Sequence, residues 1–127
     1  MLVIKTYLAA SAVQGLGVFA AEPVKKGSEV WVFDPRIDFL LPRGRWDELP
    51  EFTLTFLDNH AYADHSIYPD GYIYSTDHAK FINHSRDPNT STTGPRYVAL
   101  RDIAAGEEIT CDYRDFSWMD EPRPEYI

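Results

Sequence analysis

The sequence predicts a mostly β domain made of several small sheets, with one inserted helix. Short β-branched and aromatic runs recur along the chain, for example at residues 2–8, 29–33 and 97–100. Turn-forming residues separate these runs at intervals of roughly ten residues, which is typical of all-β proteins. Only one stretch, about 48–62, carries apolar residues at helical spacing.

The elements are justified in chain order by local residue types. After the first run, the segment GLGVFA (Gly15–Ala20) predicts either a tight turn into a strand or a close approach of backbone to a ligand. No helical pattern follows it, which excludes a dinucleotide-binding fingerprint. Asp34-Pro35 ends the next strand. The expected elements are strands at 2–8, 29–33, 72–74, 97–100 and 109–113, an apolar segment at 37–41, a polar loop at 42–47, a helix at about 48–62 and a helical turn at 77–82.

Composition limits the classes of partner. The chain has 127 residues, enough for one domain with a real core, and a net charge of -8 from 12 basic and 20 acidic residues. It lacks the basic excess that neutralises phosphates, so we expect no direct nucleic-acid ligand. An acidic surface suits a Lys/Arg-rich peptide, although it also simply keeps a protein in solution.

Cysteine content and the N-terminus predict the compartment. Cys111 is the only cysteine, so neither an intrachain disulfide nor a cysteine-based zinc site is expected. Residues 1–12 lack a basic leader, and Lys5 interrupts their apolar run, so no signal peptide is expected. No apolar run approaches the ~20 residues of a membrane span. These observations predict a cytoplasmic or otherwise intracellular protein with no membrane partner.

The stretch FINHSRDPN (residues 81–89) places an amide, an imidazole and a hydroxyl directly after the apolar pair Phe81-Ile82. Buried amides and imidazoles without partners cost about 1–3 kcal/mol each. The loop therefore either satisfies its own polar groups or binds something. Asn, Ser, Asp and Pro are ordinary turn formers, so residue types leave both alternatives open.

Taken together, GLGVFA, FINHSRDPN, ALRDIAAGEEIT and CDY resemble, in this order, the motifs of a SET domain, the fold of protein-lysine methyltransferases. The resemblance covers most of the chain. It implies a β-clip fold in which residues 1–127 form a single SET domain and the C-terminal segment threads under a loop as a pseudoknot. Residues 114–127 would be a tail that closes the active site.

The resemblance also implies a site for S-adenosylmethionine and a lysine channel. Tyr113 would be the catalytic tyrosine, which positions the amine because a phenol with a pKa near 10 is a poor base at neutral pH. Cys111 occupies the position that sets the number of methyl groups added. The implied cofactor-binding residues are Gly15, Leu16, Gly17, Asn83, His84, Phe116 and Trp118, and the implied channel residues are Tyr62, Cys111 and Phe33.

Some residues depart from the family pattern. Arg86 stands where many members have a cysteine, and the tail holds none, so the tail zinc site of those members is not expected. Phe33-Asp34-Pro35 replaces a common Tyr-x-Gly motif, so the resemblance does not define the near wall of the channel or the identity of the substrate. In size, and in the place of Trp118, the chain is similar to small stand-alone viral SET proteins.

The expected partner is a lysine-containing basic protein, with histones, histone-like proteins and ribosomal proteins all fitting. One alternative is a catalytically silent SET fold that binds a basic peptide or the cofactor. Another is a structural module that forms a homodimer to cover its aromatic tail, but this would leave the Asn-His-Ser loop unexplained. Each site residue also has an ordinary explanation: Tyr113 as core, Tyr62 as helix-end packing, Cys111 as a small core residue and Trp118 as a tail anchor.

Overall fold

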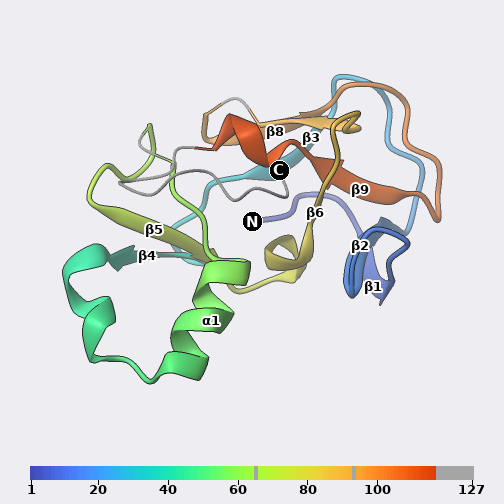
Figure 1. Cartoon of the computed structure of the whole chain (residues 1–127). Helices are drawn as coiled ribbons and strands as arrows, with labels where there is room; N and C mark the ends of the chain where they lie inside the picture. The colour runs from blue at the N-terminus through green and yellow to red at the C-terminus, as the bar shows by residue number, and fades with distance from the viewer. Residues whose placement is uncertain (65, 93, 117–127) are drawn as a thin grey trace.

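The computed structural model describes residues 1–64, 66–92 and 94–116 (Figure 1). Over this part the chain is mostly strands in three small sheets, with one α-helix, as the sequence predicted. The strands are β1 (Thr6–Ala10), β2 (Leu16–Ala20), β3 (Glu29–Val32), β4 (Asp38–Pro42), β5 (Gly71–Ser75), β6 (Asn83–His84), β7 (Thr90–Ser91), β8 (Arg96–Ala99) and β9 (Glu108–Cys111). The helices are α1 (Glu51–His60) and the 3-10 helices η1 (Arg43–Glu48), η2 (His78–Phe81) and η3 (Tyr113–Asp115).

The largest sheet has the strand order β1-β2-β9-β6. β1 and β2 form an antiparallel hairpin, and β9 pairs antiparallel with β2 through Val18 and Ile109. On its other side β9 runs parallel to β6. The C-terminal strand therefore lies between two segments that precede it by long stretches of chain, which is the placement expected of a threaded C-terminal segment.

The other two sheets are β3-β8-β7 and the hairpin β4-β5. In Figure 1, β4, β5 and α1 lie at one end of the molecule and the β1-β2 hairpin at the other, with β6 between them. The core lies among the sheets and includes Val18, Val30, Trp31 and Ile109, each at most 1% exposed. Burying side chains of this size contributes about 1.5–3 kcal/mol each before entropy is counted.

The helix α1 is shorter and more exposed than its apolar spacing indicated. It begins after Pro50, whose carbonyl accepts the N–H of Leu54, and it carries Glu51 in its first turn, where a negative charge favours the helix dipole. It ends at His60 because Tyr62 is in extended backbone paired with Ile73. None of its residues is buried. No helix in the described part of the chain is long and apolar enough to cross a membrane.

Several predicted boundaries were wrong. The first strand begins at Thr6, and Leu2 contributes only a single bridge to Trp31. The predicted polar loop at 42–47 is largely the 3-10 helix η1. The last strand ends at Cys111 rather than at Tyr113, because Asp112 caps the turn that follows by accepting the N–H of Arg114. The two-residue strands β6 and β7 were not predicted, since so short a pair leaves no alternating pattern.

Candidate functional site

A short parallel pairing brings the Asn-His-Ser loop beside the C-terminal strand. Asn83 lies opposite Thr110, and His84 lies opposite Cys111. The N–H of Ser85 extends the pairing by donating to the carbonyl of Cys111 at 2.9 Å. The two most distinctive stretches of the sequence therefore form one structural unit.

At Asn89, the polar side chain of the loop is hydrogen-bonded within the protein and is not left for a ligand. The side chain is 2% exposed, and its Nδ2 donates to the carbonyl of Glu108 at 2.7 Å. Its Oδ1 accepts the N–H of Thr110 at 2.9 Å. Asn89 thus links the loop to β9 through both ends of its side-chain amide.

His84 and Tyr113 are linked directly. The N–H of Tyr113 donates to Nδ1 of His84 at 3.0 Å, and the two rings lie 5.3 Å apart. A neutral imidazole that accepts at Nδ1 carries its proton on Nε2. That Nε2 is buried and has no hydrogen-bond partner among the described residues. A buried donor of this kind is suited to a ligand acceptor.

The hydroxyl of Tyr113 is also fixed, since it donates to the carbonyl of Ile82 at 2.5 Å. Tyr113 is therefore held at both its backbone and its phenol, at the start of η3. A side chain held at two ends loses little further entropy when a ligand arrives. Such a residue can act as a fixed reference point for a reacting group.

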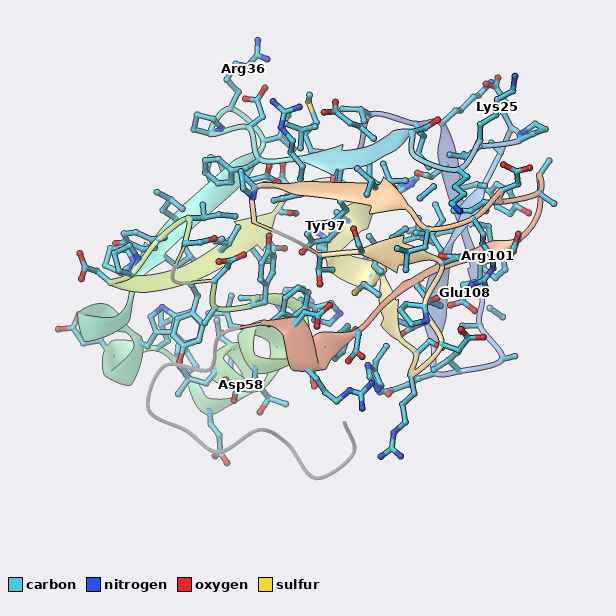
Figure 2. The ribbon with its side chains drawn as sticks, turned by 90° about the horizontal axis from the view of Figure 1, so that it is seen from above. Lys25, Arg36, Asp58, Tyr97, Arg101 and Glu108 are labelled. Atoms are coloured by element: carbon cyan, nitrogen blue, oxygen red, sulfur yellow. The ribbon has the colours of Figure 1, made fainter. Side chains whose placement is uncertain are left out.

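A narrow pocket with a cavity volume of about 60 Å³ opens beside Tyr113. Its lining combines buried apolar and aromatic side chains with two charged ones: Trp31, Tyr62, Ile82, Tyr97, Cys111, Tyr113 and Phe116, together with Asp58 and Lys80. In Figure 2, Tyr97 lies in the middle of the molecule, whereas Lys25 and Arg36 project from its edge. Burial raises the pKa of the Tyr62 and Tyr97 phenols and of the Cys111 thiol. Burial thus keeps these three groups neutral.

A wider hollow of about 450 Å³ adjoins the narrow pocket, because four residues line both: Asn59, His60, Lys80 and Tyr113. The wider hollow is also lined by Gly15, Leu16 and Asn83. Lys80 donates to the hydroxyl of Tyr74 at 3.1 Å. The two hollows therefore have a common wall, and Tyr113 is part of it.

Asn83 fixes the loop that precedes β2. Its Nδ2 lies 3.2 Å from the backbone carbonyl of Gln14 and 3.0 Å from that of Leu16. It also lies 2.9 Å from Oε1 of the Glu108 carboxylate. Within the described residues its Oδ1 has no hydrogen bond. Gly15, at a φ of +48°, lets the chain turn in the left-handed region that other residues rarely adopt. The amide therefore holds the hairpin with one end and offers an acceptor with the other.

The structure brings together most of the residues that the sequence singled out. Gly15, Leu16, Asn83 and Tyr113 line the wider hollow, and Tyr62, Cys111 and Phe116 line the narrow one. Phe116 was expected in the cofactor site, but its place is in the narrow pocket. Phe33 packs edge-on against Trp31 at 6.4 Å and does not line that pocket. Trp118 and the rest of the expected tail beyond Phe116 lie outside the described residues.

Sequence reasoning did not select Lys80, Trp31 or Tyr97, all of which line the narrow pocket. Lys80 could have been selected from the sequence, since it lies three residues before Asn83 in the helical turn that the sequence predicted. Trp31 and Tyr97 pair across β3 and β8, so only knowledge of strand register could have placed them together. The described residues contain no group of three His, Cys, Asp or Glu side chains that could hold a metal ion.

Comparison with known proteins bears on the fold and on the family. A family model described as the SET domain matches residues 15–114. No curated protein matches the sequence. Among the solved structures that share the fold, three illustrate how low the sequence identity is.

The first of them is a Plasmodium falciparum protein, whose description as a histone methyltransferase is provisional. It is 22% identical with a TM-score of 0.64, and the alignment covers 91% of this chain and 96% of that one. A humanized mutant of the Chaetomium thermophilum Polycomb Repressive Complex 2 gives 23% identity and a TM-score of 0.63 over 94% of this chain and 16% of that one. The Neurospora SET domain protein DIM-5, a histone lysine methyltransferase, is 19% identical with a TM-score of 0.59. The alignment covers 97% of this chain and 57% of that one.

Proposed function

The chain belongs to the SET domain family, and from this premise we propose that it transfers a methyl group from S-adenosylmethionine to the side-chain amine of a lysine in a protein. The observation that carries the proposal is that Tyr113 lines both of two adjoining hollows. The wider hollow would hold the methyl donor, and the narrow one would admit the lysine side chain. When bound, S-adenosylmethionine would supply an electrophilic methyl group.

The residues of the wider hollow fit such a donor. His84 does not itself line the hollow, but it follows Asn83, which does, and its buried Nε2–H has no partner among the described residues; such a donor suits an acceptor nitrogen of a purine. The Oδ1 of Asn83 is an acceptor that suits an ammonium group. The hairpin at Leu16 is anchored by Asn83, so this wall of the hollow is formed before a ligand arrives.

The narrow pocket supplies the other requirement, an uncharged amine. A free lysine has a pKa near 10.4, and its ammonium is not a nucleophile. The burial that raises the pKa of Tyr62 would also penalise a charged ammonium beside this ring, so this part of the pocket favours the neutral amine. Tyr113, held by Ile82 and His84, would orient the amine in line with the methyl group.

The proposed substrate is a basic protein, because the chain carries a net charge of -8 and Asp58 lines the narrow pocket. The direct test is incubation with S-adenosylmethionine labelled in its methyl group, using core histones and a lysate of the host as substrates. We expect label on lysine that is lost in Tyr113→Phe. A wild-type protein that binds S-adenosylhomocysteine but labels nothing would instead support a silent binding module.

A further inference from the structure

The carboxylate of Glu108, in β9, lies where three segments of the site meet. Its Oε1 accepts from Nδ2 of Asn83 at 2.9 Å and from Oγ of Ser11 at 2.7 Å. Its Oε2 accepts from the same hydroxyl at 2.9 Å. Figure 2 shows Glu108 beside the strands of the β1-β2 hairpin. One side chain thus connects β9, β6 and the turn between β1 and β2.

The charge of Glu108 is not neutralised within the described residues. Its hydrogen-bond partners are a hydroxyl and an amide, and it forms no ion pair with the described residues, whereas the carboxylate of the neighbouring Glu107 lies 3.9 Å from the guanidinium of Arg101. An N–H that donates to a carboxylate makes a hydrogen bond roughly twice as strong as one to a neutral acceptor. Hydrogen bonds in a chain also polarise one another, which makes Oδ1 of Asn83 a better acceptor.

Gly17 shows that the backbone is built around this carboxylate. A Cβ at Gly17 would lie 2.1 Å from Oε1 of Glu108 and 2.8 Å from its carboxyl carbon. Ser11, the second partner of Glu108, accepts the N–H of Val13 at 2.9 Å and so shapes the turn before Gly17. The missing side chain at Gly17 makes room for Glu108 and does not serve only for ligand approach.

We propose that Glu108 is a positioning residue that acts through Asn83. It holds Nδ2 against the hairpin backbone, so that Oδ1 is presented to the positively charged amino-acid end of the methyl donor. This inference rests on the proposed function. It predicts that loss of the Glu108 charge weakens donor binding more than it slows the bound complex.

The experiment is calorimetric titration of S-adenosylhomocysteine into the wild type, Glu108→Gln, Asn83→Ala and the double variant, with steady-state kinetics on the same proteins. Glu107→Gln is the matched control, because it removes the same charge from the next residue. We expect Glu108→Gln to weaken binding about tenfold and to raise KM for the donor, with kcat changed less than about twofold. In the Asn83→Ala background, Glu108→Gln should cost less than about twofold, since coupled residues are not additive.

Equal affinities of Glu108→Gln and Glu107→Gln would overturn the inference while leaving the proposed function standing. A full tenfold loss of affinity from Glu108→Gln in the Asn83→Ala background would overturn it too. A wild type that binds no S-adenosylhomocysteine would overturn the proposed function and this inference with it. Thermal unfolding gives a test without ligand: Gly17→Ala should lower Tm, and adding Glu108→Ala should recover part of the loss. Failure to recover any of it would overturn the packing on which the inference stands.

Discussion

The ring of Phe116 stacks on the ring of Tyr62, with centroids 4.7 Å apart and planes inclined by 28°. Phe116 also stacks on Tyr113 at 5.7 Å. It follows η3 directly and is 8% exposed, so it is both a wall of the narrow pocket and part of the core. The stability of the chain and the shape of the narrow pocket therefore depend on the same ring.

Phe116→Ala should lower the free energy of unfolding by about 3 kcal/mol, because it leaves a cavity in the core. Urea denaturation measures this change. Phe52→Ala is the matched control, since Phe52 is 78% exposed and its removal should change stability by less than about 0.5 kcal/mol. Equal effects of the two substitutions would contradict the core position of Phe116.

Tyr113→Phe should lower kcat by about 100-fold or more while leaving donor affinity nearly intact, because small misplacements of reacting groups carry costs of this size. The variant also loses the bond to the carbonyl of Ile82, so a stability loss of about 1 kcal/mol is expected. Single-turnover kinetics beside donor titration separate the two effects. Unchanged turnover, or a collapse of donor binding alone, would refute the positioning role.

His84→Ala should weaken S-adenosylmethionine binding by roughly 1–3 kcal/mol, the usual effect of losing a buried hydrogen-bond partner. Titration calorimetry on a folded variant measures it. His78→Ala is a suitable control, because His78 bonds to the hydroxyl of Thr6 and lines a separate hollow with it, whereas His84 is bonded to the backbone of Tyr113. Unaltered affinity in folded His84→Ala would contradict the assignment of His84 to the donor site.

The wild type should add more than one methyl group, and Cys111→Tyr should add fewer. Cys111 is 2% exposed and lines the narrow pocket, and a thiol takes less room than a phenol and binds water weakly. Mass spectrometry of a modified peptide over time measures the product. If Cys111 is only a small core residue, the substitution will overpack the core and destabilise the fold instead. A wild type that stops at monomethyl-lysine at exhaustive reaction would refute the space argument.

Acid should loosen the turn that carries Tyr113. Hydrogen bonds from Arg114 lower the pKa of Asp112 to about 2, below the value of about 3.9 for a free aspartate. The charged cap therefore stabilises the native state above about pH 4, and this contribution is lost as the pH falls from about 4 to about 2. Acid unfolding of Asp112→Asn should lack this component. Superimposable pH profiles of the two proteins would show that the cap contributes nothing.

The elements that depend on local pattern were predictable, and those that depend on long-range pairing were not. The helix α1, the turn at η2 and most strands followed from spacing and turn residues. The exposure of Phe52 could not be predicted, because helical spacing identifies the apolar face of a helix but not whether another element packs on it. Motif order predicted that Asn83, His84 and Tyr113 meet. The separation of Phe116 from the wider hollow, and the place of Glu108, required the register of β9 against β2 and β6.

The position of β9 between β2 and β6 also sets an order of events during folding. Ribosomes deliver the N-terminal elements first, yet neither hollow has its full lining until the chain has emerged as far as Tyr113 and Phe116. Pairings between distant segments also slow folding, because loop closure opposes them before contacts form. A nascent or clipped chain lacking residues after 107 would have no β9 and no Tyr113. Such a fragment would lack part of the lining of both hollows, so under the proposed function it should transfer no methyl group until β9 is in place.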